Sequence, residues 1–353
     1  MIEQLFRSYL IAYLFWLGIA LGCLPVLMLH HLVGGTWGFV IRRILEAGTR
    51  TLPLMLLLFL PLLLGIHSLY EWSHPEVVAQ DSILQAKRAY LNVPFFVIRA
   101  AVYFAAWLLF SYFLNRWSVE QDETGDPQLT RRFQLLSAPG IVVYSLAITF
   151  ASIDWAMSLE PHWFSTIYGM LFIVGQSLAA LAFVIPVAAW LSESPPVSHF
   201  LKADVFQDLG NLLLTFVMLW AYVSFSQYLI IWSGNLPEEI PWYLHRGSYG
   251  WQWVAAFLAL FHFIVPFLLL LSRGSKRRKT FLAVIAASVL LMRWVDLYWL
   301  IAPSFLRNVR IHWLDVLLFF AIGILWAYAF FAQLNKRTYL PQRDPSFVLE
   351  KAG

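Results

Sequence analysis

Acidic residues and histidines interrupt segments of the chain that are otherwise strongly apolar. Asp154, His262 and Asp296 lie inside such segments, and Glu160 and Asp208 lie near segment ends. Ionisable groups at membrane depth are costly and often functional. A buried carboxyl group binds its proton more tightly, and histidine titrates close to neutral pH, so both can exchange protons under working conditions. The five residues therefore form a candidate proton path, and none is expected to be catalytic.

A structural interpretation of the same residues stays open. Arg293 and Asp296 are three positions apart on a predicted helix, so they can form an ion pair that only holds helices together. A lone His262 is also typical of a hydrogen-bonded packing residue. Ser224 and Gln227 share one face of their predicted helix, and Arg99 lies inside another. Aromatic rings around such groups can hold a quinone, although aromatic residues are abundant throughout.

Metal and haem sites are not indicated. The single cysteine, Cys23, excludes an internal disulfide, a cysteine-ligated iron–sulfur cluster and the Cys-x-x-Cys-His haem attachment. The histidines are not paired to face each other across a helix bundle, which argues against haem b. We therefore expect no metal ligands and no covalently bound cofactor.

A short hairpin at residues 152–175 is the most distinctive stretch. It places Asp154 inside one apolar segment and then gathers polar and aromatic side chains at the membrane surface. Trp155, Glu160, His162 and Trp163 are predicted to form an outward-facing cap that docks a partner. Simple anchoring at the membrane interface is the alternative, because tryptophan is common there.

The elements that must position these residues are membrane-spanning helices. The chain of 353 residues is 60% hydrophobic and 12% charged, whereas soluble domains carry about 25% charged residues. Apolar runs of membrane-spanning length predict an all-α polytopic protein. The nine predicted spans are residues 8–30, 52–70, 93–115, 139–159, 163–191, 208–232, 250–271, 280–302 and 312–334.

Lysine and arginine are distributed unequally between the two sides of these spans. Sixteen lie on one side and six on the other, so the first side is predicted to be cytoplasmic. The C-terminus is then inside, and the N-terminus and the hairpin are outside. The chain has no basic stripe with interleaved aromatic residues, so nucleic acid is not an expected partner.

An internal repeat predicts two parallel halves. The pattern of serine, leucine, phenylalanine and glycine that links Ser8 to Gly18 recurs from Ser165 to Gly175, 157 residues later. The expected domains are a four-helix bundle at 1–160, a second at 161–303, and a final helix with a cytoplasmic tail at 304–353.

Several motifs together resemble the ActF-type membrane subunit of bacterial alternative complex III, a relative of NrfD-like subunits that is also called quinone-binding subunit 2. They lie at residues 6–10, 15–18, 29–32, 42–47, 152–155 and 157–166. The run from Ser152 to Thr166 is the most specific of them. The resemblance extends over essentially the whole chain.

The resemblance implies a subunit of a bacterial inner-membrane complex that oxidises quinol and passes electrons to a cytochrome c or an oxidase. Its expected partners are a sister NrfD-like membrane subunit, multihaem cytochrome c subunits and an iron–sulfur protein. Haem c and iron–sulfur clusters would belong to those partners. The chain itself would be a scaffold with a candidate proton path, and a quinone or quinol would bind within the complex.

One departure from that family concerns the N-terminus. Its members usually carry a further membrane helix before the segment that matches residues 6–10, which gives ten spans with both ends inside. The hypothesis is that the start at Met1 is internal or that this lineage lacks the helix.

Two other functions remain alternatives. A secondary transporter also shows repeats and buried charges, but favours helices broken at mid-membrane in matching spans. Pro61 and Pro186 are not in matching spans, which disfavours a transporter. A purely structural scaffold is the third interpretation.

Overall fold

The computed structural model describes residues 1–195 and 197–344, and the regular elements in this part of the chain are helices. The longer helices are α1 (Ile2–Val33), α2 (Thr36–Thr49), α3 (Leu52–Leu64), α7 (Val93–Thr124), α8 (Gln128–Trp155), α9 (Tyr168–Leu191), α10 (Ala203–Gly234), α12 (Trp251–Leu258), α13 (Val265–Leu271), α15 (Lys279–Ile301) and α16 (Trp313–Leu334). The shorter ones are α4 (Ile66–Leu69), α5 (Pro75–Gln80), α6 (Ser82–Lys87), α11 (Ile240–Arg246) and α14 (Arg273–Arg277). A π-helix, η4 (Ala259–Ile264), joins α12 to α13.

Nine helical segments among the described residues are long and apolar enough to cross a membrane. This confirms the predicted all-α polytopic class. The second segment runs from Thr36 to Leu64 because α2 leads directly into α3, whereas the predicted span, 52–70, corresponds to α3 and α4 alone. Residues 345–353 of the predicted cytoplasmic tail, including Lys351, lie outside the described residues.

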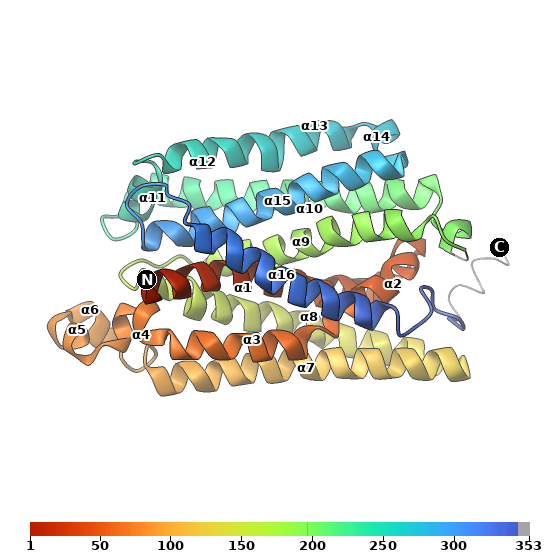
Figure 1. Cartoon of the computed structure of the whole chain (residues 1–353), viewed down its shortest axis with the longest axis horizontal. Coiled ribbons are helices and arrows are strands. Elements are labelled where there is room, and N and C mark those ends of the chain that lie inside the picture. Colours follow the sequence, from red (N-terminus) through yellow and green to blue (C-terminus); the bar gives the residue numbers. More distant parts are fainter. Residues whose placement is uncertain (196, 345–353) are drawn as a thin grey trace.

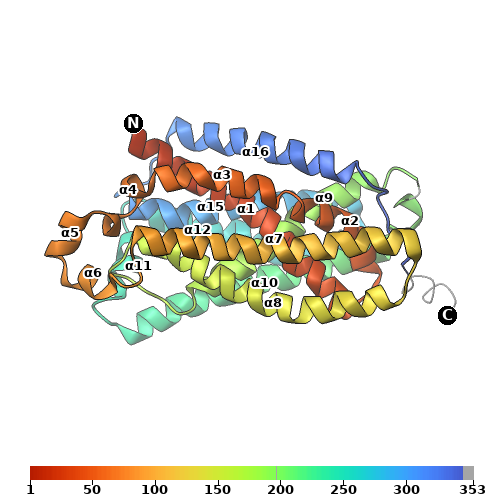
Figure 2. The same cartoon turned by 90° about the horizontal axis from the view of Figure 1, so that it is seen from below.

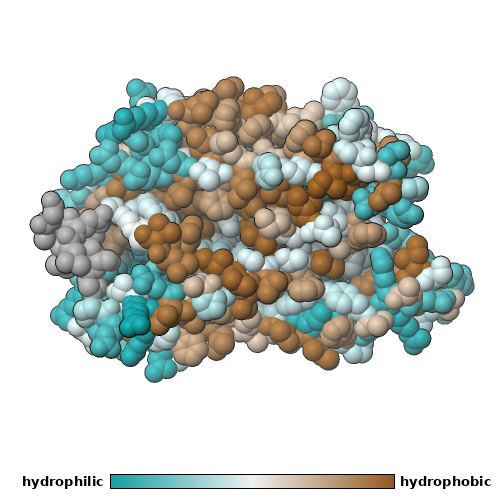
Figure 3. Space-filling view, turned by 180° about the vertical axis from the view of Figure 1, so that it is seen from behind, coloured by the Kyte–Doolittle hydropathy of each residue, from teal (hydrophilic) through white to brown (hydrophobic). Residues whose placement is uncertain are grey.

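The spanning helices lie side by side along the long axis of the molecule, with the N-terminus and the described end of the chain at opposite ends (Figure 1). We call the end that holds residues 155–168 the hairpin end, and the end that holds α14 and the start of α2 the basic end. A hydrophobic band lies between more hydrophilic ends (Figure 3). Such a band is the surface expected of a chain surrounded by lipid.

Local sequence signals set several helix boundaries. The Asn92 side chain accepts a hydrogen bond from the backbone N–H of Phe95 at the start of α7, which is a typical N-cap. Gly125 ends that helix with a φ of 67°, a conformation that glycine adopts without strain. At the start of α16, His312 and Asp315 form a reciprocal capping box.

Helices α1 and α9, which carry the predicted repeat, pack against each other at the centre of the bundle. A Cβ atom on Gly22 of α1 would lie 2.0 Å from the backbone oxygen of Gln176 in α9, so glycine is needed for this close approach. α3, α7 and α8 lie on one side of this pair and α10, α12, α13 and α15 on the other (Figure 1). The domain boundaries at 160 and 303 stay predictions.

The last spanning helix covers the first. The Ser8 hydroxyl of α1 donates to Asp315 Oδ1 of α16 at 2.5 Å, and Trp16 Nε1 donates to the backbone oxygen of Phe319 at 2.9 Å. With α9 on one face and α16 on another, most of the apolar length of α1 is buried. The first and last spans are therefore one packing unit, although about 300 residues separate them.

Helix α2 holds a cluster of buried charges at the basic end. The fully buried Glu46 carboxylate accepts hydrogen bonds from Arg42 Nε at 2.9 Å and Arg43 Nη1 at 2.7 Å. Arg42 also binds Asp344 at 2.9 Å, and Arg43 binds Asp122 of α7. These contacts tie α2 to α7 and to the chain beyond α16.

Candidate functional site

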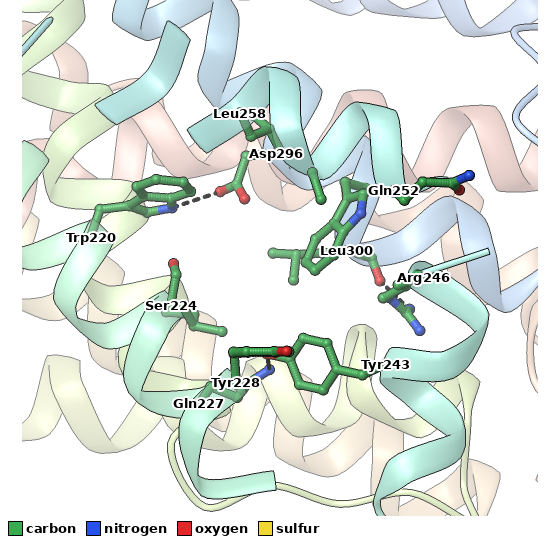
Figure 4. A pocket seen from close by; sticks show the side chains of 14 residues that line it. Trp220, Ser224, Gln227, Tyr228, Tyr243, Arg246, Gln252, Leu258, Asp296 and Leu300 are labelled. Atoms are coloured by element: carbon green, nitrogen blue, oxygen red, sulfur yellow. Dashed lines mark hydrogen bonds between the residues drawn. The ribbon is translucent and has the colours of Figure 1, made fainter. Parts of the chain in front are cut away.

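A pocket lies within the second half of the bundle, toward the hairpin end. Its volume is about 310 Å³, at the lower end of the range for small-molecule sites, roughly 300–1,000 Å³. Its walls come mainly from α10, α11, α12 and α15 (Figure 4). The lining residues are Leu171, Trp220, Ser224, Gln227, Tyr228, Tyr243, Arg246, Gly247, Gln252, Ala255, Leu258, Asp296, Trp299 and Leu300.

Asp296 supplies the carboxylate of this pocket. Its Oδ2 atom accepts a hydrogen bond from Trp220 Nε1 at 3.0 Å and also pairs with Arg293. Its Oδ1 atom has no hydrogen-bond partner among residues 1–195 and 197–344. One carboxylate oxygen is therefore held in place by the protein, and the other remains able to accept a hydrogen bond from a ligand.

Other lining residues carry buried polar atoms that the described protein does not satisfy. Gln227 Nε2 donates to the Tyr243 hydroxyl at 3.3 Å, but Gln227 Oε1 has no partner. Trp299 Nε1 and Arg246 Nε are buried without partners as well. An unsatisfied buried polar atom is unfavourable, so these three side chains gain hydrogen bonds if they turn toward a polar ligand in the pocket.

His262 lies behind the pocket wall. It is fully buried in η4, and its ring meets the Trp220 ring edge-on at 4.2 Å between centroids. Neither ring nitrogen has a partner in the described chain. A π-helical turn within a long helix often marks a functional site. The structure thus brings both His262 and Asp296 into contact with Trp220.

The hairpin positions α11, which forms one wall of the pocket. Glu160 Oε1 accepts from Arg246 Nη2 at 2.7 Å, and the Trp163 ring stacks on Trp242 at 4.6 Å. Arg246 in turn lies 3.6 Å over the Trp242 ring and donates to the backbone oxygen of Leu300 at 2.7 Å. Two residues of the distinctive hairpin therefore fix the helix that carries Tyr243 and Arg246.

The protonation states of α11 follow from its surroundings. Burial lowers the pKa of the Arg246 guanidinium, and the adjacent Glu160 carboxylate opposes that shift. Burial raises the pKa of the Tyr243 hydroxyl. Arginine stays protonated throughout the physiological range, so the wall offers a cation and a neutral hydroxyl to a ligand.

Glu160→Gln is expected to loosen α11. The change removes a charge-assisted hydrogen bond to a buried guanidinium, which contributes about 1.5–3 kcal/mol. We expect faster hydrogen–deuterium exchange in the peptide that spans residues 240–250. His162→Gln is the matched control, because His162 is exposed and contacts Asp81 rather than α11. Equal exchange in the two variants would contradict a positioning role for Glu160.

A glycine of the predicted repeat makes room for Arg293. A Cβ atom at Gly175 would lie 2.3 Å from Arg293 Cζ, whereas one at Gly18, its counterpart in the repeat, would meet Gln176 Cγ at 3.5 Å. Gly175→Ala is therefore expected to cost about 1–3 kcal/mol by displacing the guanidinium. Gly18→Ala should be neutral or slightly stabilising. Thermal unfolding in detergent measures both, and equal stability of the two variants would contradict the clash.

The other predicted proton-path residues lie elsewhere. Asp154 is fully buried in the first half, where Arg99 donates to both of its carboxylate oxygens at 2.8 Å and Tyr103 donates at 2.8 Å. Asp208 is exposed near the start of α10 at the basic end. Of the five residues of the predicted proton path, three are associated with the pocket. Asp296 lines it, His262 packs against its Trp220, and Glu160 binds its Arg246.

The predicted docking cap needs correction. Trp155 and Trp163 are buried, at 3% and 5% exposure, because they pack against Phe59 and Trp242. Their side chains cannot present a surface to a partner. His162 remains exposed and contacts Asp81 at 2.6 Å. Backbone N–H donation from Leu84 and the contact with His162 lower the pKa of Asp81.

Most of the pocket residues are not predicted from the sequence, among them Arg246, Trp220 and Trp299. Arg246 lies between predicted spans, where a charge is ordinary, and the two tryptophans do not stand out among the 17 in the chain. The face shared by Ser224 and Gln227 was the one available signal, and both residues line the pocket.

Comparison with known proteins does not identify a family. No protein-family model matches the chain, and no significant match is found among curated proteins. Functional inference therefore rests on the residues and on the geometry of the pocket. In the described part of the chain, no group of three or more histidine, cysteine, aspartate or glutamate side chains is placed to hold a metal ion.

Proposed function

We propose that the chain is an integral membrane subunit of a quinol-oxidising electron-transfer complex, and that the pocket between α10, α11, α12 and α15 holds the quinol head group. The observation that carries this proposal is the pairing of one half-satisfied carboxylate, Asp296, with unpartnered polar atoms among aromatic rings. A quinol is a flat ring with two hydroxyl groups, and it needs aromatic walls with a hydrogen-bond acceptor and donors.

The chemistry assigned to the pocket is proton handling. Asp296 Oδ1 accepts the proton of one quinol hydroxyl. The Gln227 and Trp299 side chains turn toward the ligand as it binds, so that Gln227 Oε1 accepts a hydrogen bond from the other hydroxyl and Trp299 Nε1 donates to the carbonyl oxygen that forms. Oxidation to the quinone releases two protons and two electrons. Asp296 takes the first proton, the second passes by way of water to Glu160, the carboxylate toward the hairpin end, and the electrons leave one at a time to one-electron redox groups on a partner subunit.

The position of the pocket supports a lipid-soluble ligand. Tyr228 and Gln252 line the pocket and are exposed on the outside of the bundle. Exposed apolar side chains surround them on the same helices, including Phe225 at 62% and Trp253 at 73%. A quinol dissolved in the hydrocarbon region could therefore enter from the side, with its isoprenoid tail left in lipid.

The alternatives fit this geometry less well. A transporter favours broken helices in matching spans. The seventh span is interrupted by η4. Its counterpart in the predicted repeat is the third span, which is the continuous helix α7 of 32 residues. A purely structural scaffold gives no reason for a pocket that is lined by a buried carboxylate and reaches exposed residues on the outside of the bundle.

The first experiment isolates the tagged full-length chain from its native membranes in mild detergent and records the reduced-minus-oxidised visible spectrum. We expect c-type haem bands and quinol-oxidising activity to co-purify with the chain. A colourless chain without that activity would contradict membership of such a complex.

A second experiment tests the pocket itself. A photoreactive azidoquinone should label peptides that contain Trp220–Arg246 and Asp296–Leu300, and excess unlabelled quinone should compete. Labelling confined to other subunits would exclude this pocket while leaving the proposed complex intact.

A further inference from the structure

A second cavity lies at the basic end, on the side of the molecule where α3, α7 and α16 meet. Its volume is about 480 Å³. In both cartoon views α3 lies between α16 and α7 (Figure 1 and Figure 2). The lining residues are Arg50, Pro53, Leu108, Ser111, Tyr112, Asn115, Arg116, Gln333 and Arg337. Among the described residues, three arginines and no acidic residue thus line this cavity.

The arginines of the cavity are weakly neutralised. Arg50 and Arg337 reach Glu46 only at 3.4 and 3.5 Å, and that carboxylate is already bound more closely by Arg42 and Arg43. Arg50 Nε also donates to the side-chain oxygen of Asn115 at 2.6 Å. Both guanidiniums are therefore held in place while much of their positive charge remains available.

Arg116 adds a charge without a described counterion. Its Nη1 atom lies 3.3 Å from the Tyr112 hydroxyl, and no ion pair to it is found among the described residues. Ion pairs join Arg42, Arg43, Arg50 and Arg337 to Glu46, Asp122 and Asp344, and Arg116 of the cavity lining stands outside these pairs. Five cations against three anions leave a surplus of two positive charges beside the cavity.

The surroundings of the cavity are apolar and suit the hydrocarbon chains of a lipid. Pro53, Leu108 and Tyr112 form part of its lining, and exposed apolar residues continue from them along the helices. Leu57, one turn beyond Pro53, is 63% exposed, and Leu109 is 55% exposed. A ligand whose charged group sits among the arginines would extend apolar chains along α3 and α7.

We propose that this cavity binds the head group of an anionic phospholipid. Basic pockets between membrane helices on the positively charged side are suited to phosphate head groups, and arginine forms paired hydrogen bonds to phosphate oxygens. The apolar track favours a lipid over a free anion. The inference is independent of the proposed quinol site, which lies toward the hairpin end.

The test measures lipid binding to the delipidated full-length chain in detergent by the rise in its unfolding temperature. The probes are cardiolipin, phosphatidylglycerol and phosphatidylcholine, each titrated separately. Each basic side chain near an anionic head group contributes roughly fivefold in affinity. We therefore expect Arg116→Gln to weaken the apparent affinity for anionic lipid about fivefold, and Arg116→Gln with Arg337→Gln about 25-fold.

Controls separate this site from general basicity and from soluble anions. Arg131→Gln with Arg278→Gln removes two exposed charges outside the cavity and should leave the affinity unchanged. An equal loss in that control, or an unchanged affinity in the cavity variants, would overturn the proposal. Inorganic phosphate at the same phosphate concentration should not stabilise the chain. Full stabilisation by inorganic phosphate would instead identify a soluble-anion site. Arg116→Gln breaks no described ion pair, so it stays informative if the double variant does not fold.

Discussion

Glu46→Gln is expected to lower the free energy of unfolding by about 3–5 kcal/mol, the usual effect of breaking a buried ion pair. The amide has nearly the same shape as the carboxylate, but it carries no charge to balance Arg42 and Arg43. Both guanidiniums remain buried, at 1% and 2% side-chain exposure. Their remaining partners, Asp344 and Asp122, cannot neutralise the whole cluster.

The measurement for Glu46→Gln is denaturation of the purified chain in mixed micelles, followed by tryptophan fluorescence. Glu120→Gln is the matched control, since Glu120 forms an exposed pair with Arg132 at 3.9 Å, and such pairs contribute about 0–1 kcal/mol. If both variants unfolded at the same denaturant concentration, the charge cluster on α2 would not stabilise the packing of α2 against α7.

Under the proposed function, Asp296→Asn is expected to reduce quinol oxidation by about 100-fold, because general base catalysis typically contributes 10²–10⁴-fold. The amide can still accept the hydrogen bond from Trp220, but it cannot take up a proton. Arg293 then loses its charged partner, so some stability is lost as well. Turnover is therefore expressed per folded complex, with Asp208→Asn as a surface control that should retain full activity.

A companion variant keeps the Asp296 prediction informative if the asparagine variant fails to assemble. Trp299→Phe retains an aromatic ring and removes only the unpartnered indole N–H. It should raise the apparent KM for quinol with little change in unfolding temperature. Wild-type kinetics in both variants would rule out this pocket as the quinol site.

Asp154→Asn should behave differently from Asp296→Asn. Asp154 is enclosed by Arg99 and Tyr103, and every described contact of its carboxylate is internal to the first half. We expect a less stable chain whose remaining folded fraction oxidises quinol at the normal rate. A specific loss of turnover with intact assembly would instead support the predicted place of Asp154 in a proton path.

The spans could be predicted because lipid imposes a simple rule on composition. A run such as residues 52–64, uncharged and rich in leucine, can only be a buried or lipid-facing helix. Helix α2 could not be predicted, because its composition is charged rather than apolar. Its charges, including Arg42, Arg43 and Glu46, are typical of an exposed loop, and only partners at Asp122 and Asp344 make their burial favourable. Such distant partners cannot be read from local sequence.

The site was predicted in part. Buried ionisable residues drew attention to Asp296, His262 and Glu160, because each is expensive in an apolar setting. The same criterion selected Asp154, which has an internal partner, and Asp208, which is exposed. It overlooked Arg246 because α11 is too short to cross a membrane. The hairpin motif was recognised, but its action through Arg246 and Trp242 depends on tertiary contacts between the halves.

The burial of α1 between α9 and α16 has a consequence for biosynthesis. Helix α1 precedes both neighbours in the chain, so it can pack against α9 once residue 191 has been made, but against α16 only after residue 334 has been made. The contact of Gly22 with Gln176 of α9 therefore becomes available first, and Ser8 has no Asp315 to accept its hydrogen bond until α16 follows. Insertion of α1 into the bilayer and completion of its packing are thus separate events, and truncation before α16 leaves α1 without the contacts of Ser8 and Trp16.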